Sequence, residues 1–193
     1  MSVAVVLYLD PQAAEIVRGM WRQLADRNIS CYMLNLGVRP HVSLAVYDRL
    51  EFKDARKRLA DFAESISPFP LTLSTTGSFS GDNRVLFLGA AANEVLLRVH
   101  RDFHRLFERH KASEREYYLE GRWIPHCTLA ERLPNELALG TVIADLQTQL
   151  PIRAIVSEIG IVEFRPVKEL CTFALTGVQH QPADAPYGAR KLE

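Results

Sequence analysis

One pattern occurs twice in this chain of 193 residues, as Pro40-His41-Val42-Ser43-Leu44-Ala45 and, 85 positions later, as Pro125-His126-Cys127-Thr128-Leu129-Ala130. In both copies the histidine follows a proline and precedes a hydroxyl side chain by two positions. At ordinary residue frequencies, a proline before, a hydroxyl at plus two and a leucine at plus three surround fewer than about one histidine in a thousand. Chance therefore does not explain the two copies.

The two copies belong to a longer internal repeat. The residues Val-Leu-Tyr-Leu at 6–9 correspond to Val-Leu-Phe-Leu at 85–88, and Phe79 corresponds to Phe164. Both halves have the order strand, helix, strand, helix and paired strands. We interpret residues 1–178 as one α+β domain of two pseudo-symmetric lobes.

Local signals place the individual elements. Residues 3–9 form a β-branched apolar run typical of a strand, and Asp10-Pro11 then predicts a helix start with an N-cap and a proline in the first turn. Apolar side chains spaced three and four residues apart continue this first helix. A loop is expected over residues 77–83. Further helices are expected over 52–66, 94–110 and 139–150, and further strands over 42–47, 71–73, 84–89, 154–162 and 170–175.

Composition excludes several classes of protein. The chain carries 23 basic and 23 acidic side chains and is 48% hydrophobic, which is typical of a folded domain and not of a disordered or fibrous protein. Zero formal net charge argues against non-specific coating of nucleic acid, which needs many lysines and arginines. The longest apolar run is far shorter than the roughly 20 residues that cross a bilayer, so no membrane helix is expected.

The termini and cysteines favour a cytoplasmic protein. The amino terminus lacks the basic segment of a signal peptide, so export is not expected. The three cysteines, Cys31, Cys127 and Cys171, are widely spaced and contain no CxxC pair. Neither a disulfide framework nor a zinc site is therefore expected. Residues 179–193 show no periodicity and are expected to form a flexible tail.

The repeated motif has a chemical meaning if each copy lies on a strand. Side chains alternate between the two faces of a strand, so His41 would point with Ser43, and His126 with Thr128. Cys127 would point the other way, into the core, as a packing residue. Pseudo-symmetry would bring the two pairs to a common groove with two imidazoles and two hydroxyls. That is a phosphate-sized acid/base site.

These residues resemble the 2H phosphoesterase superfamily, whose defining feature is two H-x-[S/T]-hydrophobic motifs in a duplicated α+β fold. The resemblance spans residues 1–178 and implies two antiparallel-type sheets flanking a central groove, with helices outside. Within the superfamily the chain is similar to the RNA 2′,3′-cyclic phosphodiesterase and 2′-5′ RNA ligase-like branch, through Ser78-Phe79-Ser80-Gly81 and the strand at 84–89. Serine stands at position 43 where threonine is common, so the hydroxyl remains but the methyl that stiffens the rotamer is missing.

The resemblance implies a metal-independent phosphoesterase, without a cofactor, acting on 2′,3′-cyclic phosphate ends of RNA or nucleotides. His41 and His126 would be acid and base, with the assignment between them open, and Ser43 and Thr128 would bind the phosphate. The alternatives are a 2′-5′ phosphodiesterase, an ATP-independent 2′-5′ RNA ligase, or a binding module without turnover. No membrane and no obligate protein partner are inferred.

Residues around the motifs and repeated loops are candidates for substrate binding. Side chains that could hold phosphates are Arg39, Arg84, Arg122, Arg165 and Lys168, and those that could stack a base are Phe79, Trp123 and Phe164.

A second group of histidines lies on the helix expected over residues 94–110. His100 and His104 have the four-residue spacing of a metal pair, with His110 nearby. The arginines between them predict a solvated basic face instead, and no metal site is expected.

Overall fold

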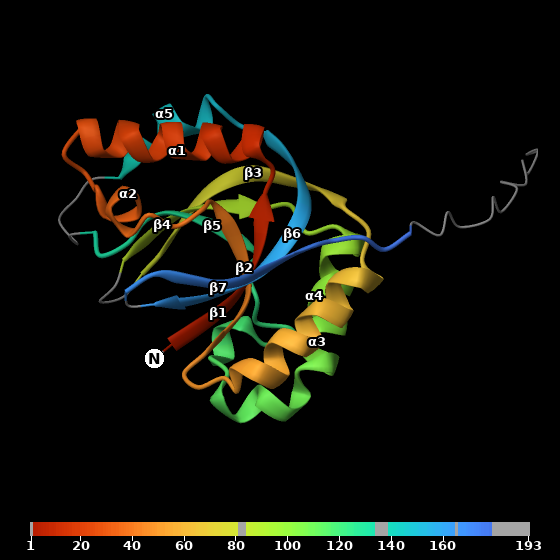
Figure 1. Ribbon diagram of the computed structural model, residues 1–193. Helices are drawn as coiled ribbons and strands as arrows, with labels where there is room; N and C mark the ends of the chain where they lie inside the picture. The colour runs from red at the N-terminus through yellow and green to blue at the C-terminus, as the bar shows by residue number, and fades with distance from the viewer. Residues whose placement is uncertain (1, 81–83, 134–138, 165, 179–193) are drawn as a thin grey trace, which may run out of the picture.

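A computed structural model describes residues 2–80, 84–133, 139–164 and 166–178 (Figure 1). In chain order the elements are β1 (Ser2–Leu9), α1 (Pro11–Asp26), α2 (Tyr32–Leu36), β2 (His41–Tyr47), α3 (Phe52–Ser65), β3 (Phe69–Phe79), β4 (Val85–Ala90), α4 (Glu94–Leu106), the 3₁₀ helices η1 (Glu108–Ser113) and η2 (Glu116–Tyr118), β5 (His126–Ala130), α5 (Gly140–Gln147), β6 (Ile152–Phe164) and β7 (Lys168–Ala174).

The sheet order reflects the repeat in the sequence. The strands run β2-β1-β6-β3-β4-β5, with β7 paired to β6 outside this path. All pairings are antiparallel. In this order each strand of the first repeat has a counterpart in the second: β1 corresponds to β4, β2 to β5 and β3 to β6. If every strand is replaced by its counterpart, the same order is obtained, read from the opposite edge of the sheet. Each repeat therefore contributes its third strand to the half of the sheet that the other repeat builds.

The expected fold class, antiparallel strands with helices outside, is confirmed, and one detail differs. The strands form one sheet of seven strands rather than two sheets, because residues 69–73 of β3 pair with residues 152–156 of β6. This pairing satisfies two strand edges that separate sheets would leave open. The outermost strands of the path, β2 and β5, lie next to each other in space.

The first helix begins where the sequence predicts. The Asp10 side chain accepts hydrogen bonds from the backbone N–H groups of Gln12 (3.0 Å) and Ala13 (3.1 Å), and Pro11 occupies the first helical position. Six side chains of α1 are buried against the sheet, namely Ala13, Ala14, Val17, Met20, Trp21 and Leu24. Ile16, which shares their spacing, stays 38% exposed at the edge of this face.

Helices of different repeats pack together at the periphery of the sheet (Figure 1). In α3 and α4, the rings of Phe62 and Phe103 lie 6.0 Å apart. Beside α5, the C-cap residue of α1, Arg27, pairs with Asp145 at 2.5 Å. One continuous hydrophobic core runs beneath these helices. Among the helices that the structure describes, none has the length and apolar character needed to cross a membrane.

Some local expectations differ from the structure. The loop expected over residues 77–83 starts later, because β3 continues through Phe79 and pairs with β4 as far as Val85. The helix expected to reach residue 110 ends as an α-helix at Leu106 and continues as η1. The short helix α2 carries no periodic pattern and was not expected. The predicted tail, residues 179–193, and Arg165 lie outside the described residues.

Gly160 on β6 lies where β1, β6 and β7 are closely packed. A Cβ atom at this position would lie 2.8 Å from Cε2 of Tyr8 and 2.9 Å from the Cys171 carbonyl oxygen. Because the second neighbour is backbone, we expect Gly160→Val to lower the free energy of unfolding by about 1 to 3 kcal/mol. Urea unfolding measures the loss.

Gly140→Ala is the matched control, because a Cβ atom there meets nothing within 4 Å. It should leave stability unchanged or raise it slightly, since alanine favours a helix over glycine. Equal stability of the two variants would contradict the packing described around Gly160.

Candidate active site

The two repeated motifs lie on neighbouring edge strands with the predicted alternation of faces. His41 and Ser43 on β2 are half-buried, while Val42 between them is fully buried. On β5, His126 and Thr128 are likewise half-buried around the buried Cys127. Each histidine therefore shares a strand face with its hydroxyl partner.

Both histidines are oriented by the same local contact. Nδ1 of His41 lies 2.7 Å from the Arg39 carbonyl oxygen, and Nδ1 of His126 lies 2.6 Å from the Ile124 carbonyl oxygen. A carbonyl oxygen only accepts, so Nδ1 carries the proton in both rings. Nε2 is then the nitrogen that can gain or lose a proton at the site.

The proline before each histidine fixes this contact. Proline restricts the preceding residue to extended conformations, which sets the position of the carbonyl that receives Nδ1–H. The carbonyl oxygen of Pro40 accepts from the N–H of Leu9 at the end of β1 (3.3 Å), and that of Pro125 accepts from the N–H of Ala90 at the end of β4 (2.9 Å). The same hydrogen bonds thus support both copies.

Two tryptophans hold the backbone at the hydroxyl residues. The indole N–H of Trp123 donates to the Ser43 carbonyl oxygen, and that of Trp21 donates to the Thr128 carbonyl oxygen, both at 3.0 Å. Trp21 comes from α1 and Trp123 from the segment before β5, so each bond links a motif to a segment of the other half of the chain.

His41 lies in a polar environment. Its ring meets the Tyr8 ring edge-on with centroids 6.5 Å apart, and the Arg39 guanidinium stacks on Tyr8 at 3.8 Å from the ring centroid. The Tyr8 hydroxyl donates to Glu169 at 2.7 Å, and Arg39 also forms an ion pair with Glu158. These contacts hold the residue whose carbonyl orients His41.

His126 lies in an aromatic environment instead. The rings of Phe79 and Phe87 stack on each other at 4.3 Å, and both contact His126, at 5.0 and 5.2 Å between centroids. Gly77 makes this arrangement possible, because a Cβ atom there would lie 2.5 Å from the Phe87 ring. Phe87 occupies the place in the second repeat that Tyr8 occupies in the first.

Burial lowers the pKa of both catalytic candidates. For His41, desolvation outweighs the Arg39 carbonyl, which favours the protonated form, and a positive charge on His126 lowers the pKa further. For His126, desolvation outweighs the Ile124 carbonyl. The charge of His126 acts on His41 because the strands that carry them, β2 and β5, lie next to each other.

Cys127 behaves as a packing residue, as predicted. It is 1% exposed, and burial raises the pKa of its thiol to about 12, so the thiolate is not formed near neutrality.

The structure brings only some of the predicted substrate-binding residues to the motifs. Phe79 touches His126, whereas Arg39 lies beside His41 with its charge already paired to Glu158. Arg84 directly precedes β4, and Lys168 begins β7. Arg122 forms an exposed ion pair with Glu116.

Two aromatic candidates are engaged elsewhere. Trp123 stacks its ring on His100 at 3.9 Å with nearly parallel planes, so that face cannot stack a base. Phe164 pairs in register with Ser2, at the far end of β1 from Tyr8, and packs against the buried cluster formed by Ala4, Val6, Tyr8, Val46 and Val162. Six residues of extended strand span about 20 Å, so Phe164 is not brought to His41.

The expectation of a solvated basic face around His100 is wrong. His100 is only 3% exposed, and its Nε2 lies 2.8 Å from both the Tyr118 carbonyl oxygen and Nε2 of His104. Nδ1 of His104 lies 3.2 Å from Glu114, whose side chain is also buried. The four-residue spacing puts His100 and His104 on the same side of α4. Trp123 stacks on His100 and covers this side of the helix. Within the described ranges, no group of three or more His, Cys, Asp or Glu side chains could hold a metal ion.

Three residues near the motifs were not singled out from sequence. Tyr8 and Glu169 are described above, and the Tyr118 side chain interacts with Ser43. This interaction gives Ser43 a partner that can orient its hydroxyl in place of the absent methyl. The sequence does contain an indication for Tyr8, because the equivalent position of the second repeat holds phenylalanine and only Tyr8 carries a polar group there. Tyr118 and Glu169 have no such signal.

The arrangement can perform paired proton transfer at an anionic centre. It offers two imidazoles, each with one hydroxyl beside it. In each imidazole Nε2 is the nitrogen that accepts or donates a proton. Imidazole exchanges protons near neutrality, and hydroxyl donors suit phosphate oxygens.

Comparisons with known proteins identify a family and relatives that are similar to this chain. The family described as the 2′-5′ RNA ligase superfamily matches residues 9–167. A Geobacillus kaustophilus (strain HTA426) protein, GK0864, named as a candidate phosphoesterase, is 28% identical over 120 residues, which are 60% of this chain. The chain matches 62% of the length of that curated relative.

Solved structures share the fold at low sequence identity. TT0787 of Thermus thermophilus superposes with a TM-score of 0.61 at 20% identity, over 93% of this chain and 100% of its own. E. coli LigT in apo form gives 0.60 at 17% identity, over 91% of this chain and 97% of its own. LigT has also been solved in complex with 3′-AMP, with the same TM-score of 0.60 and 17% identity, over 90% of this chain and 97% of its own.

Burial of His100 makes stability depend on pH. Desolvation, together with the charge of His104, lowers the pKa of His100 to about 4 in the folded protein, against an ordinary 6.5. Between these values the unfolded chain binds a proton that the folded protein does not, so stability falls as pH falls through this window, by up to about 3 kcal/mol.

The variant His100→Gln cannot titrate but keeps an amide donor for Tyr118. Urea unfolding at pH 7 and pH 4 should therefore show a smaller loss of stability in this variant than in the wild type, by about 2 to 3 kcal/mol. The same loss in both proteins would contradict a neutral, buried His100.

Proposed function

Because the chain belongs to the 2′-5′ RNA ligase superfamily, we propose that it is a phosphoesterase that hydrolyses 2′,3′-cyclic phosphate ends of RNA or nucleotides. The observation that carries this proposal is the matched orientation of His41 and His126, each donating Nδ1–H to the carbonyl two residues earlier. Both rings then have Nε2 available for proton transfer.

The reaction needs one neutral and one protonated imidazole. Nε2 of the neutral ring accepts a proton from water as the water oxygen attacks phosphorus. The bond from phosphorus to one ribose oxygen breaks, and Nε2–H of the other ring donates its proton to that oxygen. The products are a phosphate monoester and a free ribose hydroxyl, and the site is left with one proton on the opposite ring.

The two hydroxyls stabilise the charge that grows on phosphate. Ser43 and Thr128 lie two residues after the histidines on the same strand faces, so each can donate a hydrogen bond to a non-bridging oxygen. Donors placed in advance cost no reorganisation during the reaction. The Tyr118 side chain, which interacts with Ser43, lies beside this hydroxyl.

The ligands of LigT support a nucleotide substrate. That protein has been solved with 3′-AMP and with phosphate. A site for a phosphate attached to ribose is what the proposed reaction requires in this chain.

Formation of a 2′-5′ bond is the second candidate, favoured by the description of the matching family. A ribose hydroxyl would replace water as the nucleophile, and the cyclic phosphate would supply the energy, so ATP would not be needed. The same histidines would serve because the steps are the reverse of diester cleavage.

Removal of either histidine tests the mechanism. The wild type should hydrolyse nucleoside 2′,3′-cyclic phosphates in excess EDTA, because the proton carriers are imidazoles. His41→Ala and His126→Ala should each lower kcat by about a hundred- to ten-thousandfold. Steady-state kinetics measures both, and circular dichroism checks that the variants are folded.

Cys127→Ala is the control, since it lies between His126 and Thr128 but faces the core. It should retain most activity and lose some stability through the cavity it leaves. A fully active single-histidine variant, or a folded but inactive Cys127→Ala, would refute the assignment.

The pH profile follows from the lowered pKa values. Above both values the proton donor is lost, and below both the base is lost, so kcat/KM should be bell-shaped. Because burial lowers both pKa values, the maximum should lie on the acid side of pH 6.5. A kcat/KM profile from about pH 4 to 9 measures this, and a maximum near pH 8 or above would contradict it.

A further inference from the structure

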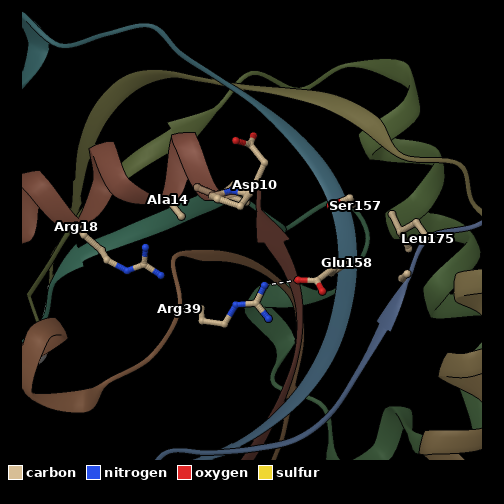
Figure 2. Close-up of a pocket in the computed structure, with 10 residues that line it drawn as sticks. Asp10, Ala14, Arg18, Arg39, Ser157, Glu158 and Leu175 are labelled. Carbon is tan, nitrogen blue, oxygen red and sulfur yellow. Dashed lines mark hydrogen bonds and ion pairs between the residues drawn. The ribbon is translucent and has the colours of Figure 1, made fainter.

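A cavity of about 500 Å³ lies beside the first motif (Figure 2). Its walls come from the first half of α1, from Arg39 before β2, and from the region where β6 and β7 pair. This volume is within the range of cavities that bind small ligands. Neither motif histidine lines it, so it is separate from the proposed reaction centre.

Arg39 connects the cavity to the reaction centre. Its carbonyl oxygen accepts the Nδ1–H of His41, while its guanidinium lines the cavity. The Arg39 guanidinium lies 3.8 Å from the centroid of the Tyr8 ring, and that ring lies 6.5 Å from the His41 ring, so one aromatic ring separates this wall of the cavity from the histidine. A substrate with its terminal phosphate at His41 could therefore extend into this space.

The acidic groups that line the cavity are already engaged. Asp10 caps α1 through Oδ1 and accepts from the N–H of Ile155 through Oδ2 at 2.7 Å. Its carboxylate points away from the arginines in Figure 2. Glu158 is ion-paired with Arg39. The negative charge of each carboxylate is therefore partly compensated, which weakens its repulsion of an anion in the cavity.

Arg18 supplies the positive charge that remains. Its guanidinium extends from α1 toward the same space as that of Arg39 (Figure 2). Its acidic neighbour, Glu15, lies 3.5 Å away but is bound more closely by Arg22, at 2.5 Å. Arg18 is therefore weakly compensated, and guanidinium groups bind phosphate with paired hydrogen bonds.

The rest of the wall is apolar. Leu9, Ala14 and Leu175 line the cavity with almost fully buried side chains, and Pro11 adds a further apolar surface. Of these residues Pro11 is exposed, so a sugar or base can rest on its ring above the buried side chains while a phosphate meets the arginine. This combination of apolar wall and cation matches a nucleotide better than a free phosphate ion.

We propose that this cavity binds the nucleotide unit that precedes the cyclic phosphate end of the substrate, with Arg18 on the connecting phosphate. The inference rests on the proposed function and narrows it: the preferred substrate is an RNA end of at least two nucleotides. A nucleoside cyclic phosphate would fill only the site at the histidines.

Three substrates of increasing length test the proposal: cytidine 2′,3′-cyclic phosphate, its 5′-phosphorylated form, and the dinucleotide ApC ending in a 2′,3′-cyclic phosphate. The wild type should show kcat/KM rising along this series, by at least about tenfold from the first to the last, the effect of one charge-assisted contact. No rise along the series would overturn the proposal.

Two variants address the cavity directly. Arg18→Ala should reduce the ratio of kcat/KM for the dinucleotide to that for cytidine cyclic phosphate by about tenfold. Ala174→Trp, at an exposed position on the cavity wall, should reduce the same ratio by filling the space. The control is Arg27→Ala, which removes the same charge at the far end of α1 and should keep the wild-type ratio. A wild-type ratio in both test variants would overturn the proposal.

Failure of the proposed function would look different. If the wild type hydrolyses none of the three substrates, the reaction is wrong but the cavity can still be tested by calorimetric binding of the dinucleotide pApCp. An affinity about tenfold weaker in Arg18→Ala than in Arg27→Ala would support the cavity as a nucleotide site. Equal affinities would overturn it.

Discussion

The pairing of β3 with β6 is the contact on which the rest of the structure depends. It joins the two repeats into one antiparallel sheet, and through it each repeat completes the half of the sheet built by the other. The curl of that sheet brings the edge strands β2 and β5 together, and with them the two motifs. Without the pairing of β3 with β6, each motif would lie on a separate small sheet. Nothing would then bring together two histidines that are 85 positions apart in the chain.

Within each half, orientation of the histidine is a local matter. The proline restricts the backbone, and the carbonyl two residues before the histidine receives Nδ1–H. A contact that spans only two residues works in both repeats even though Arg39 stands in one and Ile124 in the other. The tautomer is therefore a property of the motif, whereas the surroundings of the ring are not.

Those surroundings make the two halves chemically unequal. Tyr8, Arg39 and Glu169 surround His41 with polar groups, while Phe79 and Phe87 surround His126 with aromatic rings. A duplicated fold thus presents two similar proton carriers in different environments. Different environments give the two rings different proton affinities, which suits the proposed reaction with one acid and one base.

The sequence by itself determined the repeat, the start of α1, and the faces of His41, Ser43, His126 and Thr128. These follow from capping and from strand alternation, which act over a few residues. Only the tertiary structure decided the single sheet, the burial of His100 beneath Trp123, the interaction of Tyr118 with Ser43, and the cavity beside Arg39. Each of these depends on segments distant in the chain that meet by packing, and packing partners leave no periodic mark on either segment. The sequence therefore predicts the local chemistry of each motif. It does not predict the surroundings that distinguish one histidine from the other, because these come from distant segments.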